Sequence, residues 1–307
     1  MRDDWFTCHL SFSRGDFIVM QMDARIQKDL ESIRSVFPYD ISSVIVHDGG
    51  DDFLVLEVNH EWMFRFPRTE ISRKALWVEK GFLARFKVVS LLPIPDYQYI
   101  GEDFVGYPKI TGKLLDMDVF RRLSNECLTR IARQFGQFLS VVHSFPVDEA
   151  RRIGLTEGWD GWHARILQNF QDHVAPMLTP SARKNGLTRV EQMLAEPFEL
   201  TVIHGDFALE DHVLLDEKKQ ELCGVIDFAD VTLNDPAHDF QNIVEYGGEE
   251  FFEMVRKHYQ AREDPSLLHR TKLRIEARPF FEASSSLLFG FEERFKERMR
   301  YIETKYG

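Results

Sequence analysis

Two aspartates, each placed directly after a short apolar run, constrain this chain more than any other feature. The first run, Leu200 to Ile203, leads into His204-Gly205-Asp206, and the second, Leu222 to Ile226, ends at Asp227. Short apolar runs of this kind, bounded by polar and glycine residues, are typical of buried strands. The two carboxylates are therefore expected on loops that follow strands, 21 residues apart in the chain.

A carboxylate pair of this kind suits phosphoryl transfer. One carboxylate can orient and deprotonate a hydroxyl while the other holds Mg²⁺ against the phosphates, and kinase-like enzymes use a catalytic-loop Asp and a D-F-G Asp in this way. Asp206 is the candidate base, in a loop whose Gly205 permits a tight backbone, and Asp227 is the candidate metal ligand. The simpler alternative is that both aspartates only cap turns.

A second protein ligand for the metal is expected in the segment after Asp206. Two candidates stand there, Asp211 and His212. Mg²⁺ prefers oxygen ligands, of which a protein usually supplies one or two carboxylates. On chemical grounds Asp211 is the better ligand, and both residues remain candidates.

The order of the predicted elements indicates two lobes. The first 110 residues combine helices with strands at Val44–Val46, Phe53–Val58, Trp62–Phe66, Tyr97–Ile100 and Val105–Ile110; the helices are Ala24–Phe37 and 70–86, with a turn at Asp48–Asp52. Thr111-Gly112-Lys113 is predicted to be a linker. The remainder is mainly helical, with helices predicted at 118–145, 159–174, 181–194, from Asp235-Pro236 onward, and at 282–306.

This pattern predicts an α+β, bilobal, protein-kinase-like fold. The small β-rich N-terminal lobe is expected at residues 1–111 and the larger helical lobe at 112–307, while the role of residues 1–22 is not assigned. A chain of 307 residues that is 44% hydrophobic and holds 26 Phe is long enough for two cores. The nucleotide is expected between the lobes.

Arg65 and Glu79 are candidate partners in the N-terminal lobe. Arg65 stands on a strand between Phe64 and Phe66, so alternation places it on the face opposite the two rings. Glu79 lies on the following helix, where it could pair with Arg65 as a cation–Glu pair does in kinases. The alternative is a surface ion pair worth about 0–1 kcal/mol.

Composition excludes several classes of partner. The net charge of −12 leaves no basic face for nucleic acid; an acidic surface attracts cationic small molecules, although it also serves solubility. Three widely spaced cysteines form neither a disulfide framework nor a zinc pattern. No apolar stretch reaches membrane-spanning length and the N-terminus lacks the apolar core of a signal peptide. A cytoplasmic monomer without a membrane or nucleic-acid partner is expected.

The motifs resemble those of the aminoglycoside phosphotransferases, and among them the 2''-phosphotransferases. The resemblance covers roughly residues 40–305 and rests on the segments NHEWMFRFPR, GYPKITGKLL, FLSVVHS, VIHGDFALEDHVLLD and GVIDFADVTLNDPAHDF. It implies a protein-kinase-like fold and transfer of the γ-phosphate of GTP or ATP, with Mg²⁺, to an antibiotic hydroxyl, and hence antibiotic resistance.

The resemblance also implies roles for single residues. Asp206 matches the catalytic Asp, Asp227 the metal Asp and Glu79 the helical partner, whereas Arg65 stands where most members have a phosphate-binding Lys. Aligning HVLLD on the family pattern makes His212 the second metal ligand, while counting five residues from the catalytic Asp gives Asp211. Tyr107 matches the residue before the hinge, Pro108-Lys109-Ile110, where a bulky Tyr favours GTP.

The acceptor of such an enzyme is a polycation, so its site should carry carboxylates. Glu245 and Glu282 are the first candidates, with Asp239 and Glu210 as further ones. Two other functions remain open. One is a kinase of another small alcohol, such as a macrolide, fructosamine, choline or a sugar; the other is a catalytically inactive nucleotide-binding module.

Overall fold

The computed structural model describes residues 7–11, 24–48, 52–158 and 162–307. The chain divides into two compact units, one of Met1–Lys113 with Leu214–Asp230 and the other of Leu114–Val213 with Val231–Gly307. The segment Leu214–Asp230 thus groups with the N-terminal residues, whereas the sequence placed it with the helical ones. Segment 1–22, the turn at 48–52 and the helix expected from residue 159 lie wholly or partly outside the described residues.

A six-stranded antiparallel sheet forms the centre of the first unit. Its order is β1-β2-β3-β4-β6-β5, with β1 Thr7–Ser11, β2 Ser43–His47, β3 Phe53–Val58, β4 Trp62–Pro67, β5 Tyr99–Ile100 and β6 Val105–Pro108. Pro67, which lacks the N–H that a central strand needs, is the last residue of β4. The sequence predicted β2 to β6 within two residues at each end, but it did not predict β1, which pairs with β2.

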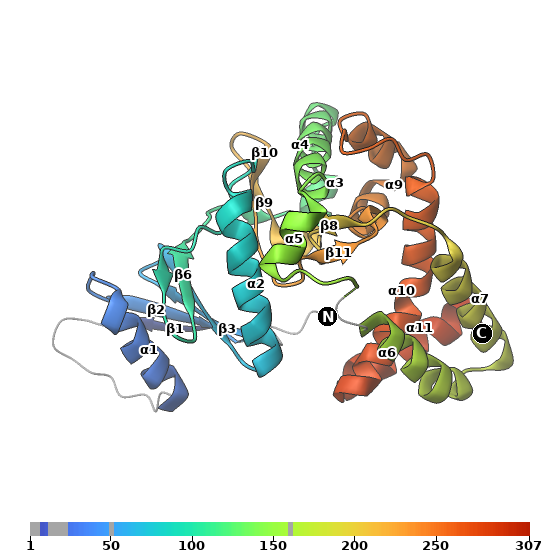
Figure 1. The fold of residues 1–307 in the computed structure, drawn as a ribbon, viewed down its shortest axis with the longest axis horizontal. Coiled ribbons are helices and arrows are strands. Elements are labelled where there is room, and N and C mark those ends of the chain that lie inside the picture. Colours follow the sequence, from blue (N-terminus) through green and yellow to red (C-terminus); the bar gives the residue numbers. More distant parts are fainter. Residues whose placement is uncertain (1–6, 12–23, 49–51, 159–161) are drawn as a thin grey trace. The chain divides into compact units, whose positions relative to one another are not determined.

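Two helices accompany this sheet, α1 (Ala24–Val36) and α2 (Glu70–Phe86) (Figure 1). Thr69 caps α2 with a reciprocal capping box to Ser72, which satisfies N–H groups that a helix start leaves without partners. Apolar residues at helical spacing bury one side of each helix. The core beside α1 contains, among others, Leu30, Ile33, Phe37, Val44, Leu56, Phe64 and Phe66.

A three-stranded sheet of order β10-β9-β7 contains the hairpin that leads to Asp227. Its strands are β7 Lys113–Leu114, β9 Val213–Asp216 and β10 Glu221–Val225. The predicted linker at residues 111–113 therefore ends in a strand. Gly224 lets β10 approach the hinge, because a Cβ at this position would lie 2.5 Å from Cγ2 of Ile110.

The second unit is mainly helical. Its first part holds α3 Met117–Arg121, α4 Asn125–His143, α5 Val147–Ile153, α6 Trp162–Asn169, η1 Phe170–Val174, η2 Ala175–Met177 and α7 Pro180–Ala195. The predicted helix over 118–145 is thus a close pair, and Ser124 caps the second member. Of the 19 residues of α4, those from Cys127 to His143 place one apolar face in the core.

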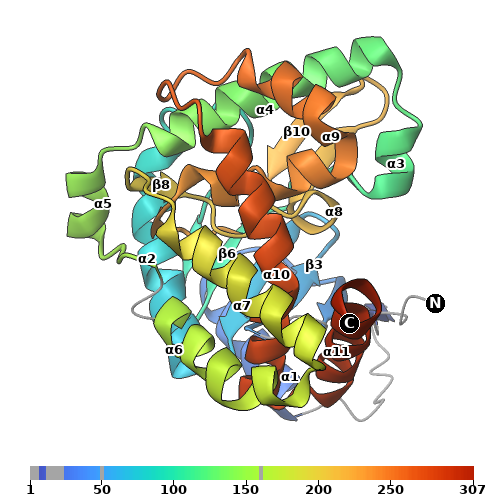
Figure 2. The same ribbon diagram turned by 90° about the vertical axis from the view of Figure 1, so that its right-hand side faces the viewer.

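The segment that carries Asp206 interrupts these helices. It contains β8 Thr201–Ile203, α8 Leu209–His212, β11 Thr232–Asn234 and η3 Pro236–His238, and β8 pairs antiparallel with β11. Helices α9 Gln241–Arg256, α10 Leu267–Phe289 and α11 Glu292–Tyr306 follow. Figure 2 shows α10 running past α7 between α9 and α11.

The predicted helix over 282–306 is wrong. Gly290 ends α10 in the left-handed region, with φ at 77°, a conformation that glycine adopts without the steric cost other residues meet. Helix α9 is also interrupted, because Gly248 has φ at 66°. Among the described helices, none combines the length and apolar character needed to cross a membrane.

Candidate active site

Arg65 and Glu79 form a buried ion pair in the first unit. Strand β4 carries Arg65 and helix α2 carries Glu79, with Nη1 of the guanidinium 2.8 Å from Oε1 of the carboxylate. Arg65 is 3% exposed and Glu79 is 0% exposed, so the alternative of a surface pair is wrong. Phe53 lies under the guanidinium, 4.1 Å from Cζ to the ring centre. Burial opposes the charge, yet Glu79 and Asp227 keep the pKa of Arg65 well above its ordinary value.

The same guanidinium also holds Asp227. Its Nη2 lies 2.9 Å from Oδ1 of Asp227, while Nη1 remains on Glu79. Asp227 has φ at 61°, an uncommon conformation for a residue with a Cβ, and its side chain is 41% exposed. The next residue, Phe228, is buried against Phe82 and Phe86 of α2 and donates its N–H to Glu79. One arginine thus ties the strand, the helix and the loop together.

Tyr97 joins the buried network around Arg65, and the sequence did not predict it. Its hydroxyl oxygen accepts a hydrogen bond from Nη1 of Arg65 at 3.2 Å, and its ring lies 5.6 Å from that of Tyr107. Burial and the neighbouring Glu79 raise the pKa of Tyr97 well above its usual value. Burial likewise raises the pKa of Tyr107 to about 12, so both hydroxyls stay protonated.

The residues expected to form the hinge lie at the end of β6 and directly after it. Pro108 ends this strand, and the N–H of Lys109 donates to the carbonyl of Glu61 at 2.7 Å, so that N–H is already engaged. Nζ of Lys109 lies 2.7 Å from the buried carboxylate of Glu57, which anchors the hinge to β3. Ile110 lies against Gly224.

In the second unit, Asp239 organises the loop that carries Asp206. Its Oδ2 accepts the N–H of His204 at 2.7 Å and its Oδ1 accepts that of Gly205 at 3.1 Å. Burial acts to raise the pKa of Asp239, but the hydrogen bond from His143 and the nearby histidines outweigh it and lower the pKa. The Asp239 side chain, expected as a further acceptor ligand, is fully buried beneath the loop, where it accepts these two backbone hydrogen bonds.

His143 and His238 support the same loop. His143 is buried between Asp239 and the hydroxyl of Tyr259, as expected for a satisfied core histidine. Nε2 of His238 lies 2.8 Å from the carbonyl of Gly205, and Nδ1 is 3.3 Å from the side-chain nitrogen of Gln241. Burial and the nearby Arg274 lower the pKa of His238 to about 4. The neutral ring therefore donates to Gly205 through Nε2.

Asp206 itself faces solvent. Gly205 precedes it with φ at 89°, which turns the backbone sharply, and the Asp206 carboxylate is 52% exposed. It is therefore accessible to an acceptor hydroxyl, as a general base must be.

The candidate metal ligands differ in their surroundings. Nδ1 of His212 lies 2.8 Å from the main-chain oxygen of Asp206; because a carbonyl only accepts, Nδ1 carries the proton in the neutral ring. Asp211, on the same short helix, is exposed. Asp227 supplies the hard oxygen that Mg²⁺ prefers. Among the described residues no three His, Cys, Asp or Glu side chains form a metal cage, and a metal that also binds phosphates does not need one.

The acceptor candidates are all engaged. Glu210 accepts a hydrogen bond from the hydroxyl of Tyr246 at 3.1 Å. Glu245 on α9 binds Arg278, and Glu282 on α10 binds Arg298. The structure thus pairs the predicted carboxylates with groups of the chain itself.

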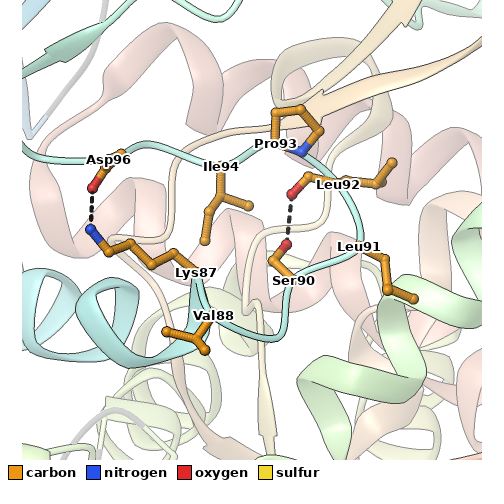
Figure 3. Close-up of a pocket in the computed structure, with 8 residues that line it drawn as sticks. All are labelled: Lys87, Val88, Ser90, Leu91, Leu92, Pro93, Ile94 and Asp96. Carbon is orange, nitrogen blue, oxygen red and sulfur yellow. Dashed lines mark hydrogen bonds and ion pairs between the residues drawn. The ribbon is translucent and has the colours of Figure 1, made fainter.

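A cavity of about 560 Å³ lies after the end of α2, and its walls come from residues between Lys87 and Asp96 (Figure 3). Nζ of Lys87 and Oδ1 of Asp96 are 2.7 Å apart there. The residues lining it include no predicted site residue, so the candidate site follows from side-chain chemistry and not from cavity size.

Together, the sheet with its buried Arg65–Glu79 pair, the Asp227 loop and the helical unit with the His-Gly-Asp loop define a protein-kinase-like phosphotransferase fold. The chain belongs to the phosphotransferase enzyme family, whose model matches residues 44–274.

Solved structures share this fold. The structure of the GDP and kanamycin complex of APH(2'')-IIIa is 26% identical in sequence to this chain and has a TM-score of 0.81. The match covers 90% of this chain and 97% of that one. A macrolide 2'-phosphotransferase of type I is 21% identical over 92% and 98% of the two chains, with a TM-score of 0.72. ADP-bound APH(2'')-Ib, an aminoglycoside phosphotransferase, is 20% identical over 92% and 97%, with a TM-score of 0.67.

Proposed function

We propose that this protein is an antibiotic kinase that transfers the γ-phosphate of GTP or ATP to a hydroxyl of an aminoglycoside, the 2''-hydroxyl, and so confers resistance. The observation that carries the proposal is the buried guanidinium of Arg65, which binds Glu79 and Asp227 at once. A cation fixed by a helix carboxylate, next to a metal-type aspartate, is the arrangement that positions nucleotide phosphates in kinases.

Each group has a role in the proposed transfer. Asp206 orients the acceptor hydroxyl and takes its proton on a carboxylate oxygen. The hydroxyl oxygen forms a bond to the γ-phosphorus as the bond from that phosphorus to the β–γ bridging oxygen breaks, and its electrons leave with the nucleoside diphosphate. Transfer is in line, without a phospho-enzyme. Arg65 binds the phosphates, and Glu79 fixes the Arg65 side chain through their ion pair.

A magnesium ion would be held by Asp227 and by Nε2 of His212, with Asp211 as the alternative to His212. When bound, it neutralises phosphate charge. The orientation of His212 supports this choice, because the Asp206 carbonyl fixes its tautomer, as groups behind metal-binding histidines commonly do.

For the nucleotide we propose GTP. Tyr107 is buried directly before the hinge, and Tyr97 packs on it, so a bulky pair borders the region proposed for the base. Both GDP and ADP occur in the similar structures. Steady-state kinetics with the two nucleotides test this; a kcat/KM for ATP equal to or above that for GTP would overturn it.

For the acceptor we propose an aminoglycoside, since APH(2'')-IIIa is similar over most of its length and was solved with kanamycin. A second candidate is a macrolide, and the pairing of Glu245 and Glu282 with arginines favours it. A monomer in the cytoplasm fits either acceptor.

The test is phosphate transfer from GTP and ATP to a panel of aminoglycosides and macrolides, with NMR of the product to locate the phosphate. Asp206→Ala should abolish most turnover while leaving nucleotide affinity near that of the wild type. Asp216→Ala, which removes a carboxylate from the end of β9, is the matched control. Retained turnover in Asp206→Ala would refute the role of Asp206, and failure with every acceptor would refute the antibiotic assignment.

A further inference from the structure

Arg278 forms a bidentate ion pair with the carboxylate of Glu245. Arg278 projects from α10 and Glu245 from α9, and the two guanidinium nitrogens Nη1 and Nη2 each contact one carboxylate oxygen, the first at 2.8 Å. The Arg278 side chain is 35% exposed and that of Glu245 is 29% exposed. Two parallel hydrogen bonds in a partly buried setting make this a strong, directional pair.

Glu282 extends the pair into a cluster. Nε of Arg278 lies 3.5 Å from Oε1 of Glu282, and Nε of Arg298 on α11 lies 2.8 Å from Oε2. We call Glu245, Arg278, Glu282 and Arg298 the arginine–glutamate cluster. Its two carboxylates meet two guanidiniums, so its formal charge is zero.

Helix α9, which carries Glu245, lies next to the loop of Asp206. Gln241, one helical turn before Glu245 on α9, contacts His238, which donates to the carbonyl of Gly205. Tyr246, the neighbour of Glu245, donates to Glu210 on the other side of Asp206. The first two turns of α9 therefore border the loop of Asp206, in the same unit of the chain.

We propose that Arg278 is a specificity-determining residue of the acceptor site. It fills the place of a substrate ammonium group on Glu245 and Glu282, so the site selects, among aminoglycosides as among other acceptors, those with few positive charges on this face. The inference rests on the proposed function, because it takes these carboxylates as part of the acceptor site.

The physical reason is competition between cations. A polycationic acceptor gains an ion pair with Glu245 only after Arg278 leaves, and the guanidinium fork fits a carboxylate better than an ammonium does. Displacement would also leave Arg278 partly buried without its partner, which costs free energy. An acceptor that presents a hydroxyl-rich or apolar face requires no displacement.

The experiment compares Arg278→Gln with Arg256→Gln by titration calorimetry. Arg256 forms an exposed pair with Glu253 on the same helix as Glu245, 2.7 Å apart, so its replacement changes the net charge equally. The probes are kanamycin, a polycation, and erythromycin, a macrolide with one amine. We expect kanamycin to bind Arg278→Gln about tenfold or more tightly than the wild type, with little change for Arg256→Gln or for erythromycin.

Equal gains in the two variants would mean a general charge effect and would overturn the proposal. Unchanged, weaker or undetectable kanamycin binding to Arg278→Gln would also overturn it. If that variant does not fold, Arg278→Lys keeps the charge without the fork and should give a smaller gain; no gain contradicts the proposal. Binding without nucleotide is independent of phosphate transfer, so failure of transfer alone would count only against the proposed function.

Discussion

The side chain of His212 donates a hydrogen bond to the main-chain oxygen of Asp206, with 2.8 Å between Nδ1 and that oxygen. The contact joins the proposed base to one of two candidate metal ligands. It also gives the two candidates different properties, because exposed Asp211 has no such contact with Asp206 among the hydrogen bonds described. The choice that the sequence left open can therefore be tested by mutation.

His212→Ala is expected to weaken Mn²⁺ binding in the presence of GDP by about tenfold or more, as loss of groups that bind or orient a metal does. Asp211→Asn should change it little. Electron paramagnetic resonance of free Mn²⁺ gives the affinities without turnover. Weaker binding in Asp211→Asn and normal binding in His212→Ala would assign the metal to Asp211.

Glu79→Gln is expected to lower the free energy of unfolding by about 3 kcal/mol or more, because it leaves the buried Arg65 charge short of a partner. Denaturant unfolding followed by circular dichroism measures the loss. The control is Asp48→Asn, whose carboxylate is 58% exposed in its pair with Arg68; its effect should stay within about 1 kcal/mol. Equal effects would show that burial does not set the strength of the Arg65–Glu79 pair.

Tyr97→Phe removes one hydroxyl from the Arg65 network and keeps the ring that lies against Tyr107. We expect a loss of about 1 kcal/mol in stability and a raised KM for the nucleotide with a smaller change in kcat. Tyr99→Phe is the control, since its ring packs with Phe37 and Trp62 away from Arg65. A nucleotide KM equal to that of the wild type would remove Tyr97 from the site.

His238 should make the protein less stable in mild acid. Its pKa is lowered from 6.5 to about 4 by burial, so below pH 6.5 the unfolded chain takes up a proton that the folded chain does not. Stability from the neutral ring is complete above pH 6.5 and falls as the pH drops towards 4, by about 1–3 kcal/mol in total. His238→Gln should flatten the unfolding free energy over this interval; an unchanged slope would contradict the assignment.

Asp235 should contribute acid sensitivity in a lower range. It is buried and binds both Arg270 and Arg274, with Oδ2 3.0 Å from Nε of each. Burial acts to raise its pKa, but the two guanidiniums prevail and lower it, so its stabilisation is present above the ordinary Asp pKa and is lost as the pH falls below it. Asp235→Asn should cost about 3 kcal/mol or more at neutral pH. If Asp235→Asn lowers the free energy of unfolding no more at pH 7 than at pH 3, this prediction is contradicted.

The sequence predicted best where neighbours along the chain are neighbours in space. Strand β4 and helix α2 are adjacent elements, so the sequence could offer Glu79 as a candidate partner of Arg65, and the two form an ion pair. Tyr97 was missed because its contact with Arg65 spans 32 residues and depends on side-chain packing. Asp239 was interpreted as a possible acceptor ligand because its hydrogen bonds to His204 and Gly205, about 35 residues away, leave no local pattern.

The charge of the proposed acceptor site also could not be predicted from the sequence. Counting carboxylates on α9 and α10 indicated a negative surface, but a charge count does not show which residue pairs with which. Arg278 follows Glu245 by 33 residues and cancels it. The break at Gly290 could have been found, since Gly after a run of apolar residues is a common signal for the end of a helix.

The first unit is discontinuous in sequence, since Leu214–Asp230 belongs with the first 113 residues. Arg65 and Asp227 are 162 residues apart in the chain, so on the ribosome the guanidinium is made long before its second carboxylate. The first part of the helical unit, Leu114–Val213, must be synthesised in between. The N-terminal unit therefore cannot complete its fold before Asp227 has been made, and a chain interrupted before that residue leaves Arg65 without its second carboxylate.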